Sequence, residues 1–209
     1  MKFVIAVLAL VGLSGCAFID QSTPISYNAP PNLEVAQGAA DITLQVSARD
    51  GRASNKDRVG SVKNGYGMET ARIISENDLV SLVRGGVENE LGSLGYKMGA
   101  GGFNVGVELQ TFYNDFKTGF FSGDSVAEVA FNLSVTKPDG GYVYSRSYKG
   151  IGMKKNIMMA VASNARPALE EALTNAMEQL INDVSLQQAL ATAARAARTS
   201  EGPRLVPSM

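Results

Sequence analysis

The sequence predicts an α+β fold in which an antiparallel sheet of four to five strands carries two long helices on one face. Two observations predict it. Several segments alternate apolar and polar residues, as half-buried strands do, and two longer segments repeat apolar residues every three or four positions, as amphipathic helices do. Because most strand-like segments follow one another directly, neighbouring strands are expected to pair antiparallel in a two-layer sandwich.

The strand-like segments form two groups. The first group contains residues 41–48, with clear alternation, and a less distinct strand within residues 61–74 that is broken near Asn64-Gly65 and Gly67. The second group is three segments in succession: 103–117, 126–136 and 142–151. Pro138-Asp139-Gly140-Gly141 separates the last two and is typical of a hairpin turn. We expect the second group to form an antiparallel meander.

The first predicted helix begins near Ser75 and ends before Gly95. Ser75 and Asp78 have the spacing of a capping box, and Gly95 supplies a left-handed stop. An apolar stripe runs between them through Leu79, Val83, Val87, Leu91 and Leu94. The pair Gly85-Gly86 lowers the helix propensity and indicates close packing against the sheet.

The second predicted helix begins at Ser163 or Asn164, either of which can serve as its N-cap. Pro167 is then expected in the first turn, where its missing N–H costs no hydrogen bond. After a break near Asp183, an Ala-rich helix over residues 185–198 is expected to extend the fold.

A short apolar run at the start of the chain predicts an export signal. Lys2 precedes eleven apolar residues, 3–13, and Ser14-Gly15 supply the small residues that a signal peptidase requires. Eleven helical residues span only about 16 Å, roughly half of a bilayer core. We therefore expect residues 1–15 to be a signal peptide and not a membrane span.

The single cysteine of the chain follows directly, and Leu13-Ser14-Gly15-Cys16 resembles a lipobox. Bacterial lipoproteins are cleaved at this signal, here between Gly15 and Cys16, and lipidated on the new N-terminal cysteine. The alternative is a plain secretory signal with an incidental cysteine, but a chain that used disulfides would carry an even number. The resemblance implies a diacylglycerol and a further acyl chain on Cys16, which together form an effectively permanent anchor.

The residue after the cysteine sorts Gram-negative lipoproteins, and Asp at that position retains them in the inner membrane. This chain has Ala17, so the resemblance implies the outer membrane, with the protein facing the periplasm. Residues 16–40 hold three prolines among small and polar residues, which predicts a lipidated cysteine and a flexible tether of about 25 to 30 Å. The periplasmic domain is then residues 41–190, followed by a helical extension and disordered tail over 191–209.

Composition argues against catalysis and against nucleic-acid binding. The chain contains no histidine, and lipidation would consume its one cysteine, so the commonest general base, metal ligand and thiol nucleophile are missing. We expect no enzyme activity, no cofactor and no metal site. The formal net charge of the whole chain is −1, whereas a nucleic-acid binder would show a clustered basic excess.

Two sets of residues are candidates for contact with a partner. Phe120 and Phe121 lie between glycines in a hairpin loop, where they are either tucked under the sheet edge or presented to a partner or a membrane. The second set is a row on one strand: Tyr142, Tyr144, Arg146 and Tyr148. Tyr and Arg are common at binding hot spots, but the same row also suits cross-strand packing.

The order of several stretches resembles a known family. These stretches are the lipobox, residues 79–98 with Leu94-Gly95-Tyr96, residues 105–115, the hairpin over 126–148 and Ala162-Ser163-Asn164. In this order they are similar to the YajG-type lipoproteins of Gram-negative bacteria, and the similarity covers residues 16–190. The resemblance implies a helix-on-sheet lipoprotein and carries over no catalytic residues.

Taken together, these features predict an outer-membrane lipoprotein that acts by protein contact, as a subunit or accessory factor of an envelope assembly or by self-association. The alternative is a carrier of a lipid or small amphiphile held between the helices and the sheet. That alternative predicts a largely apolar cavity of several hundred cubic ångströms.

Overall fold

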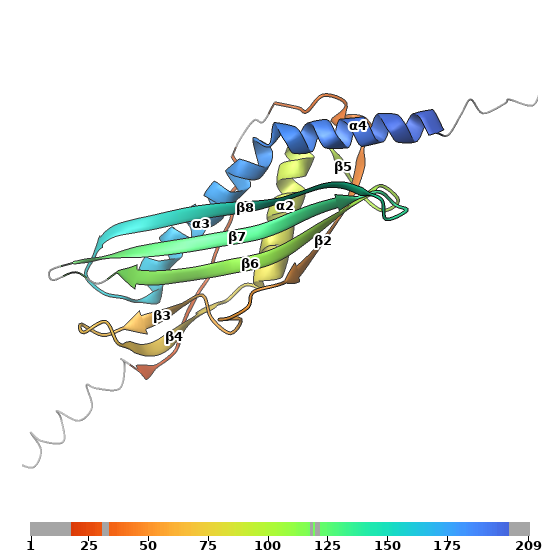
Figure 1. The fold of residues 1–209 in the computed structure, drawn as a ribbon. Helices are drawn as coiled ribbons and strands as arrows, with labels where there is room; N and C mark the ends of the chain where they lie inside the picture. Colours follow the sequence, from red (N-terminus) through yellow and green to blue (C-terminus); the bar gives the residue numbers. More distant parts are fainter. Residues whose placement is uncertain (1–17, 31–33, 118, 120–121, 201–209) are drawn as a thin grey trace, which may run out of the picture.

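The computed structural model describes residues 18–30, 34–117, 119 and 122–200. In this part of the chain one eight-stranded mixed sheet packs against helices in an α+β fold (Figure 1). The strands are β1 (Gln21–Thr23), β2 (Thr43–Asp50), β3 (Gly60–Lys63), β4 (Glu69–Ser75), β5 (Lys97–Met98), β6 (Phe103–Lys117), β7 (Gly123–Thr136) and β8 (Tyr142–Ile157). The helices are α2 (Leu79–Ser93), α3 (Ala162–Ile181) and α4 (Val184–Ser200), with a short 3-10 turn η2 (Ala39–Asp41).

The predicted meander is confirmed. Strands β6, β7 and β8 pair antiparallel along nearly their whole length, and Gly140 adopts φ +88° in the turn between β7 and β8. Apolar residues of β7 alternate inward and are fully buried from Ala127 to Val135. The sequence located these strands well because alternation and turn residues are local signals.

The rest of the sheet is larger than predicted and is not purely antiparallel. One edge of β6 is shared: β2 pairs with its first half in parallel, and Gly60 of β3 pairs with Asn114 farther along. The parallel pairing arises because the chain leaves β2, forms other elements including α2, and returns to β6 in the same direction. The segment 61–74 is the β3–β4 hairpin, whose turn lies at the predicted break near Asn64-Gly65 and Gly67. Strand β1 adds a further parallel strand on β4.

Helices α2 and α3 cover one face of the sheet (Figure 1). Their buried side chains, including Leu91, Leu169 and Leu173, meet Phe131 and Tyr148 from the sheet in one core. The predicted close packing at the glycine pair occurs at Gly86 alone, and against α3: a Cβ there would lie 2.7 Å from Met177 Cε. Gly86 therefore permits close packing of α2 against α3, and not against the sheet as predicted.

The helix starts differ from the prediction, whereas the stop of α2 is confirmed. Helix α2 begins at Leu79 with the Asp78 carboxylate accepting from Val80 and Ser81 N–H, because Ser75 still belongs to β4. Gly95 follows α2 with φ +94°, the left-handed conformation expected of a helix stop.

Helix α3 also begins earlier than predicted. It starts at Ala162, whose N–H donates to the Gln21 side-chain oxygen at 2.9 Å. Ser163 and Asn164 lie inside the helix and do not cap it. Pro167 therefore falls beyond the first turn, which corrects the predicted position.

The segment predicted as a flexible tether packs on the domain where the structure describes it. We call residues 18–30 the N-terminal strap. Within it, Ile25 is 1% exposed and its N–H donates to the Asn77 side chain at 2.7 Å, while the Ser26 hydroxyl donates to Glu170 at 2.7 Å. Burial of Ile25 and Tyr27 supplies the stabilisation that overrides the disorder expected from the prolines.

Helix α4 extends the fold beyond the sheet, as the Ala-rich sequence predicts (Figure 1). The predicted break between α3 and α4 falls at Asn182 and Asp183. Leu186 and Leu190 bury their side chains in the core, and the exposed Arg198 pairs with Asp41 at 3.2 Å. Residues 201–209, the predicted tail, lie outside the described residues.

Candidate interaction surface

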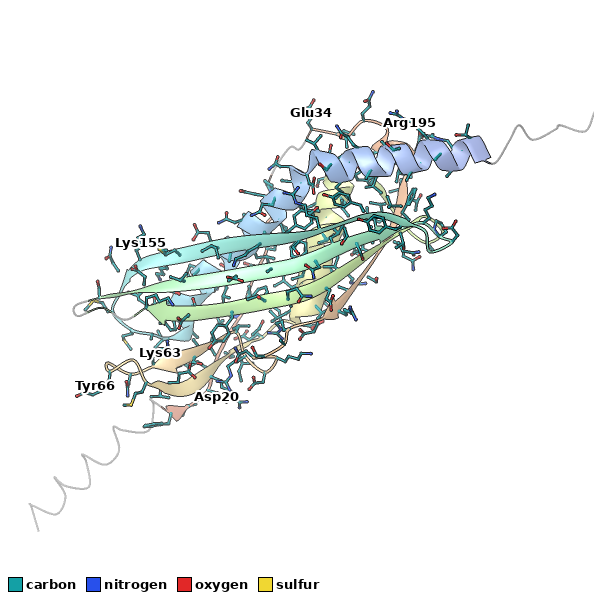
Figure 2. All side chains as sticks on the ribbon, in the orientation of Figure 1. Asp20, Glu34, Lys63, Tyr66, Lys155 and Arg195 are labelled. Carbon is teal, nitrogen blue, oxygen red and sulfur yellow. The ribbon has the colours of Figure 1, made fainter. Side chains whose placement is uncertain are left out.

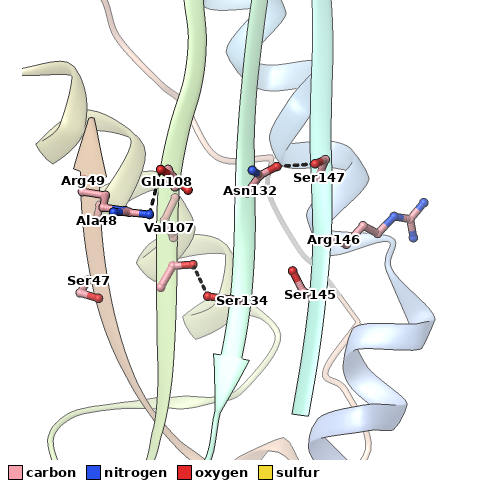
Figure 3. Close-up of a pocket in the computed structure, with 11 residues that line it drawn as sticks. Ser47, Ala48, Arg49, Val107, Glu108, Asn132, Ser134, Ser145, Arg146 and Ser147 are labelled. Atoms are coloured by element: carbon pink, nitrogen blue, oxygen red, sulfur yellow. Dashed lines mark hydrogen bonds and ion pairs between the residues drawn. The ribbon is translucent and has the colours of Figure 1, made fainter. Parts of the chain in front are cut away.

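The sheet face opposite α2 and α3 is hollowed across strands β2, β6, β7 and β8 (Figure 3). The hollow measures about 610 Å³, and most of the residues that line it are polar, four of them serines. We call it the polar groove, and its principal residues are Ser47, Gly106, Glu108, Asn132, Ser134, Ser145 and Ser147.

The groove exists because its residues are small. A Cβ on Gly106 would lie 3.0 Å from Ser134 Oγ, so even alanine would be crowded there. The Ser134 hydroxyl donates to the Gly106 carbonyl at 3.4 Å, and the Ser147 hydroxyl donates to the Asn132 side-chain oxygen (Figure 3). The surface thus offers hydroxyl and amide groups, which suit a polar partner better than a lipid tail.

An ion pair closes the β2 side of the groove. Arg49 Nη2 lies 2.9 Å from Glu108 Oε1 (Figure 3). Gly51 leaves space for this carboxylate, since a Cβ there would come within 2.4 Å of Glu108 Cγ. The Arg49 side chain is 75% exposed, so the pair shapes the rim of the groove more than it stabilises the fold.

Strand β8 forms the other side of the groove and is an edge of the sheet. Three α3 side chains, one per helical turn, cap the backbone of its second half. The Asn175 amide donates to the Ile151 carbonyl at 2.7 Å, and Gln179 donates to the Lys149 carbonyl at 2.6 Å. Glu171 Oε2 accepts from Met153 N–H at 2.6 Å. An edge that could pair with another chain is thereby blocked over this half.

The helix can reach this edge because β8 carries glycines where α3 crosses it. A Cβ on Gly150 would lie 1.9 Å from the Ala172 carbonyl oxygen, and one on Gly152 would lie 2.0 Å from the Ala168 carbonyl oxygen. Only glycine permits this approach. The contact also fills the space between α3 and the sheet.

The first half of β8 is different. Ser145 and Ser147 share the alternation of Lys149 and Ile151, so their backbone groups also point away from β7. Both residues are exposed, and no helix side chain within the described residues bonds to their backbone N–H or C=O groups. The open edge therefore lies directly beside the polar groove.

The predicted row on β8 is divided between the surface and the interior. Tyr148 is fully buried and Tyr144 is half-buried, and both hydroxyls donate to Asp183 Oδ2 at 2.7 Å. Arg146 turns away from the groove (Figure 3), and its Nη1 lies 3.2 Å from the same oxygen. Of the three tyrosines in the row, only Tyr142, 72% exposed, keeps a largely accessible ring. Burial makes Tyr148 a core residue and not part of a contact face.

Asp183 connects β8 to both helices. Its Oδ1 accepts from the N–H groups of Ser185 and Leu186 and so caps α4. Burial opposes its ionisation, but the two tyrosine hydroxyls, the Leu186 N–H and Arg146 outweigh that effect and hold the pKa of Asp183 below its usual range. The same arrangement raises the pKa of Tyr148, chiefly through burial and then through its hydrogen bond to Asp183.

A second buried acid lies beneath the N-terminal strap. Glu90 on α2 is 0% exposed, and the Tyr27 hydroxyl donates to its Oε1. Its Oε2 is buried without a hydrogen-bond partner among the described residues. Burial raises the pKa of Glu90, an effect that the hydrogen bond from Tyr27 only partly offsets.

Sequence reasoning missed the roles of Asp183 and Glu90. Asp183 was located as a helix break, and an Asp directly before an amphipathic segment could have been read as an N-cap. Glu90 falls one position before Leu91 in the apolar stripe, which is the available signal for its burial. The predicted residues Gly15, Cys16, Ala17, Phe120 and Phe121 lie outside the described residues.

The fold and the groove define a class of protein: a small α+β domain whose sheet has one helix-covered face and one open, polar face. The family model of uncharacterised lipoproteins matches residues 30–191, most of the chain. The chain belongs to this family, which confirms the resemblance to YajG-type lipoproteins. A membrane-anchored location follows from membership of a lipoprotein family.

One solved structure with a TM-score above 0.5 shares the fold. A Xanthomonas campestris protein of family DUF330 superposes with a TM-score of 0.55 at 13% identity, over 85% of this chain and 99% of that one. A minor lipoprotein from Acinetobacter baumannii gives a TM-score of 0.46 at 8% identity, over 70% and 92%. No curated protein matches the chain. Among the described residues, no helix combines the length and apolar character needed to cross a membrane.

Proposed function

We propose that this lipoprotein is anchored through Cys16 to the periplasmic face of the outer membrane and binds a protein partner without catalysis, as part of an envelope assembly. One observation carries the proposal: the open half of the β8 edge lies beside the polar groove. A partner strand paired with β8 at Ser145 and Ser147 would extend the sheet, and its side chains would reach the groove.

The absence of catalysis is supported by what the buried polar groups already do. The sequence contains no histidine, and its one cysteine lies in the lipobox. Asp183, the buried acid with most partners, is engaged in capping α4 and in holding two tyrosines. Its oxygens are thus committed to the fold.

The alternative role as an amphiphile carrier is disfavoured by the helix–sheet contact. A ligand held between α3 and the sheet would need to separate Gly150 and Gly152 from the α3 backbone, which they touch directly. Phe131, Leu169 and Met177 are also fully buried in that layer. Among the described residues, these contacts leave no space for a lipid where α3 crosses β8.

Strand addition can be tested with a proline at the open edge. Because the Ser145 N–H points away from β7, the Ser145→Pro variant should fold normally but should not pair with a partner strand. A photo-crosslinking residue at Ser147, in cells that make the lipoprotein at its native level, should give a discrete adduct that Ser145→Pro abolishes.

The matched control is Ser145→Thr, which retains the N–H and should retain the adduct. Analysis of the adduct by mass spectrometry separates a different envelope protein from a second copy of this chain. If the adduct survives Ser145→Pro while that variant unfolds at the same temperature as the parent, strand addition at β8 is wrong.

A further inference from the structure

One end of the molecule gathers the start of the described chain and several exposed apolar side chains. β1 pairs with β4 in parallel, so Phe18 and Ile19 lie toward the beginning of β4 and the β3–β4 turn. The bridge between Lys63 and Ala160 brings the loop with Met158 and Met159 to the same turn. Figure 2 shows Asp20, Lys63, Tyr66 and Lys155 at this end, away from Arg195.

The exposure at this end is large for apolar residues. Tyr66 is 91% exposed, Met158 81% and Phe18 73%. Three further side chains are more than half exposed: Ile19, Met68 and Met159. Single apolar residues on a surface need no explanation, but six at one end indicate an interaction surface. We call these six residues the apolar end.

Charge does not explain this surface. Arg72 pairs with Asp20, and both Lys63 and Lys117 pair with Asp115 at 2.7 Å. Two lysines thus share one carboxylate, and Lys155 at this end has no ion-pair partner among the described residues, so the end keeps a small positive charge. On a bilayer of zwitterionic lipid this charge adds little, so attraction at this end comes from the apolar side chains and should depend little on salt.

The position of the anchor identifies the occupant. Cys16 precedes Phe18 by two residues, which span at most about 7 Å. With the strap packed from Asp20 onward, no long tether separates a lipid on Cys16 from this end. The lipid would hold the apolar end at the bilayer surface.

We propose that the apolar end is a membrane-docking face whose occupant is the phospholipid bilayer itself. This inference rests on the anchoring part of the proposed function. Tyr66, with an apolar ring and a polar hydroxyl, suits the headgroup region, while the methionines and Phe18 enter the acyl boundary. β6 runs from Gly106 in the groove to Lys117 near this end, and this length of strand spans roughly 35 Å, so the groove lies away from the docking face.

The test uses the absence of tryptophan in this chain, because each introduced tryptophan is then a single reporter. The lipidated protein is reconstituted in phosphatidylethanolamine vesicles that carry a quencher on the acyl chains. Tyr66→Trp should be quenched and its emission shifted to the blue. Tyr142→Trp, also exposed but beside the distant β7–β8 turn, should show neither change. Equal quenching at both positions, or none at either, overturns docking.

A second measurement separates docking from anchoring. The mature chain with Cys16→Ala should partition weakly onto the same vesicles without quencher, equally in low and high salt. The double variant Tyr66→Ser and Met158→Ser should reduce that partition about tenfold, whereas Tyr142→Ser should not. If neither the double variant nor Tyr142→Ser changes the partition onto vesicles, the docking face is wrong.

Mass spectrometry of the native protein tests the anchor alone: an unmodified Cys16 removes the anchoring premise, while the partition result still decides whether the surface binds lipid. Site-specific quenching combined with an inactive β8 edge would instead retain docking and reject protein binding at that edge.

Discussion

Glu90 shows how one residue can make stability depend on pH. Its raised pKa means that the folded protein keeps a proton that the unfolded chain releases above the ordinary value of about 4.5. The unfolded state is therefore favoured progressively as pH rises from that value toward the folded pKa. Tyr27 cannot satisfy both carboxylate oxygens, so the ionised form stays costly.

We predict that Glu90→Gln stabilises the protein at pH 7 to 8 by on the order of 1 kcal/mol, since glutamine keeps an acceptor for Tyr27 without the buried charge. The gain should shrink as pH falls through 4.5, because below that value the folded and unfolded parent are both largely protonated. Urea unfolding at several pH values measures it. The matched control is Glu88→Gln, which removes the carboxylate that pairs with Arg84 on the same helix, and a pH-independent gain at Glu90 would contradict the prediction.

Among the elements, α3 packs closely on the sheet because β8 has glycines, without side chains, where α3 crosses it. Gly150 touches the Ala172 carbonyl oxygen, while Gly85 on α2 has nothing within 4 Å of where a Cβ would be. The same change to alanine should thus have opposite effects. Gly150→Ala should cost at least about 3 kcal/mol by forcing α3 from the sheet.

Gly85→Ala should stabilise by about 0.5 to 1 kcal/mol, because alanine has less freedom to lose in a helix. Thermal unfolding of both variants checks the pair. If Gly85→Ala destabilises the protein, Gly85 faces a neighbouring group after all. If Gly150→Ala is neutral, the contact between Gly150 and α3 is looser than described.

At the scale of the whole molecule, the folding unit begins earlier than the sequence suggests. A chain that starts at residue 41 lacks β1, the buried Ile25 and the Gln21 acceptor at the α3 N-terminus. We predict that it loses several kcal/mol relative to a chain that starts at residue 18, since burying Ile25 alone contributes about 1.5 to 3 kcal/mol. Chemical denaturation compares the two, and equal stability would restore the tether interpretation.

The sequence predicted what local patterns determine. β6 is predicted over the observed residues because its alternation is uninterrupted until the bulge near Gln110, and Gly95 marks a helix end by its own backbone preference. β1 could not be predicted, because three residues in a proline-containing segment become a strand only by pairing with β4. The polar groove likewise requires β2 to lie parallel beside β6, which no local pattern specifies.

The contacts between the N-terminal strap and α3 also affect how fast the chain can fold. Ser26 bonds to Glu170 and Gln21 to Ala162, so contacts join residues 144 and 141 positions apart. High contact order slows folding, because segments that are distant in sequence must meet before their contacts can stabilise the fold. A nascent chain with this topology would therefore remain open until its first and last segments have both been synthesised.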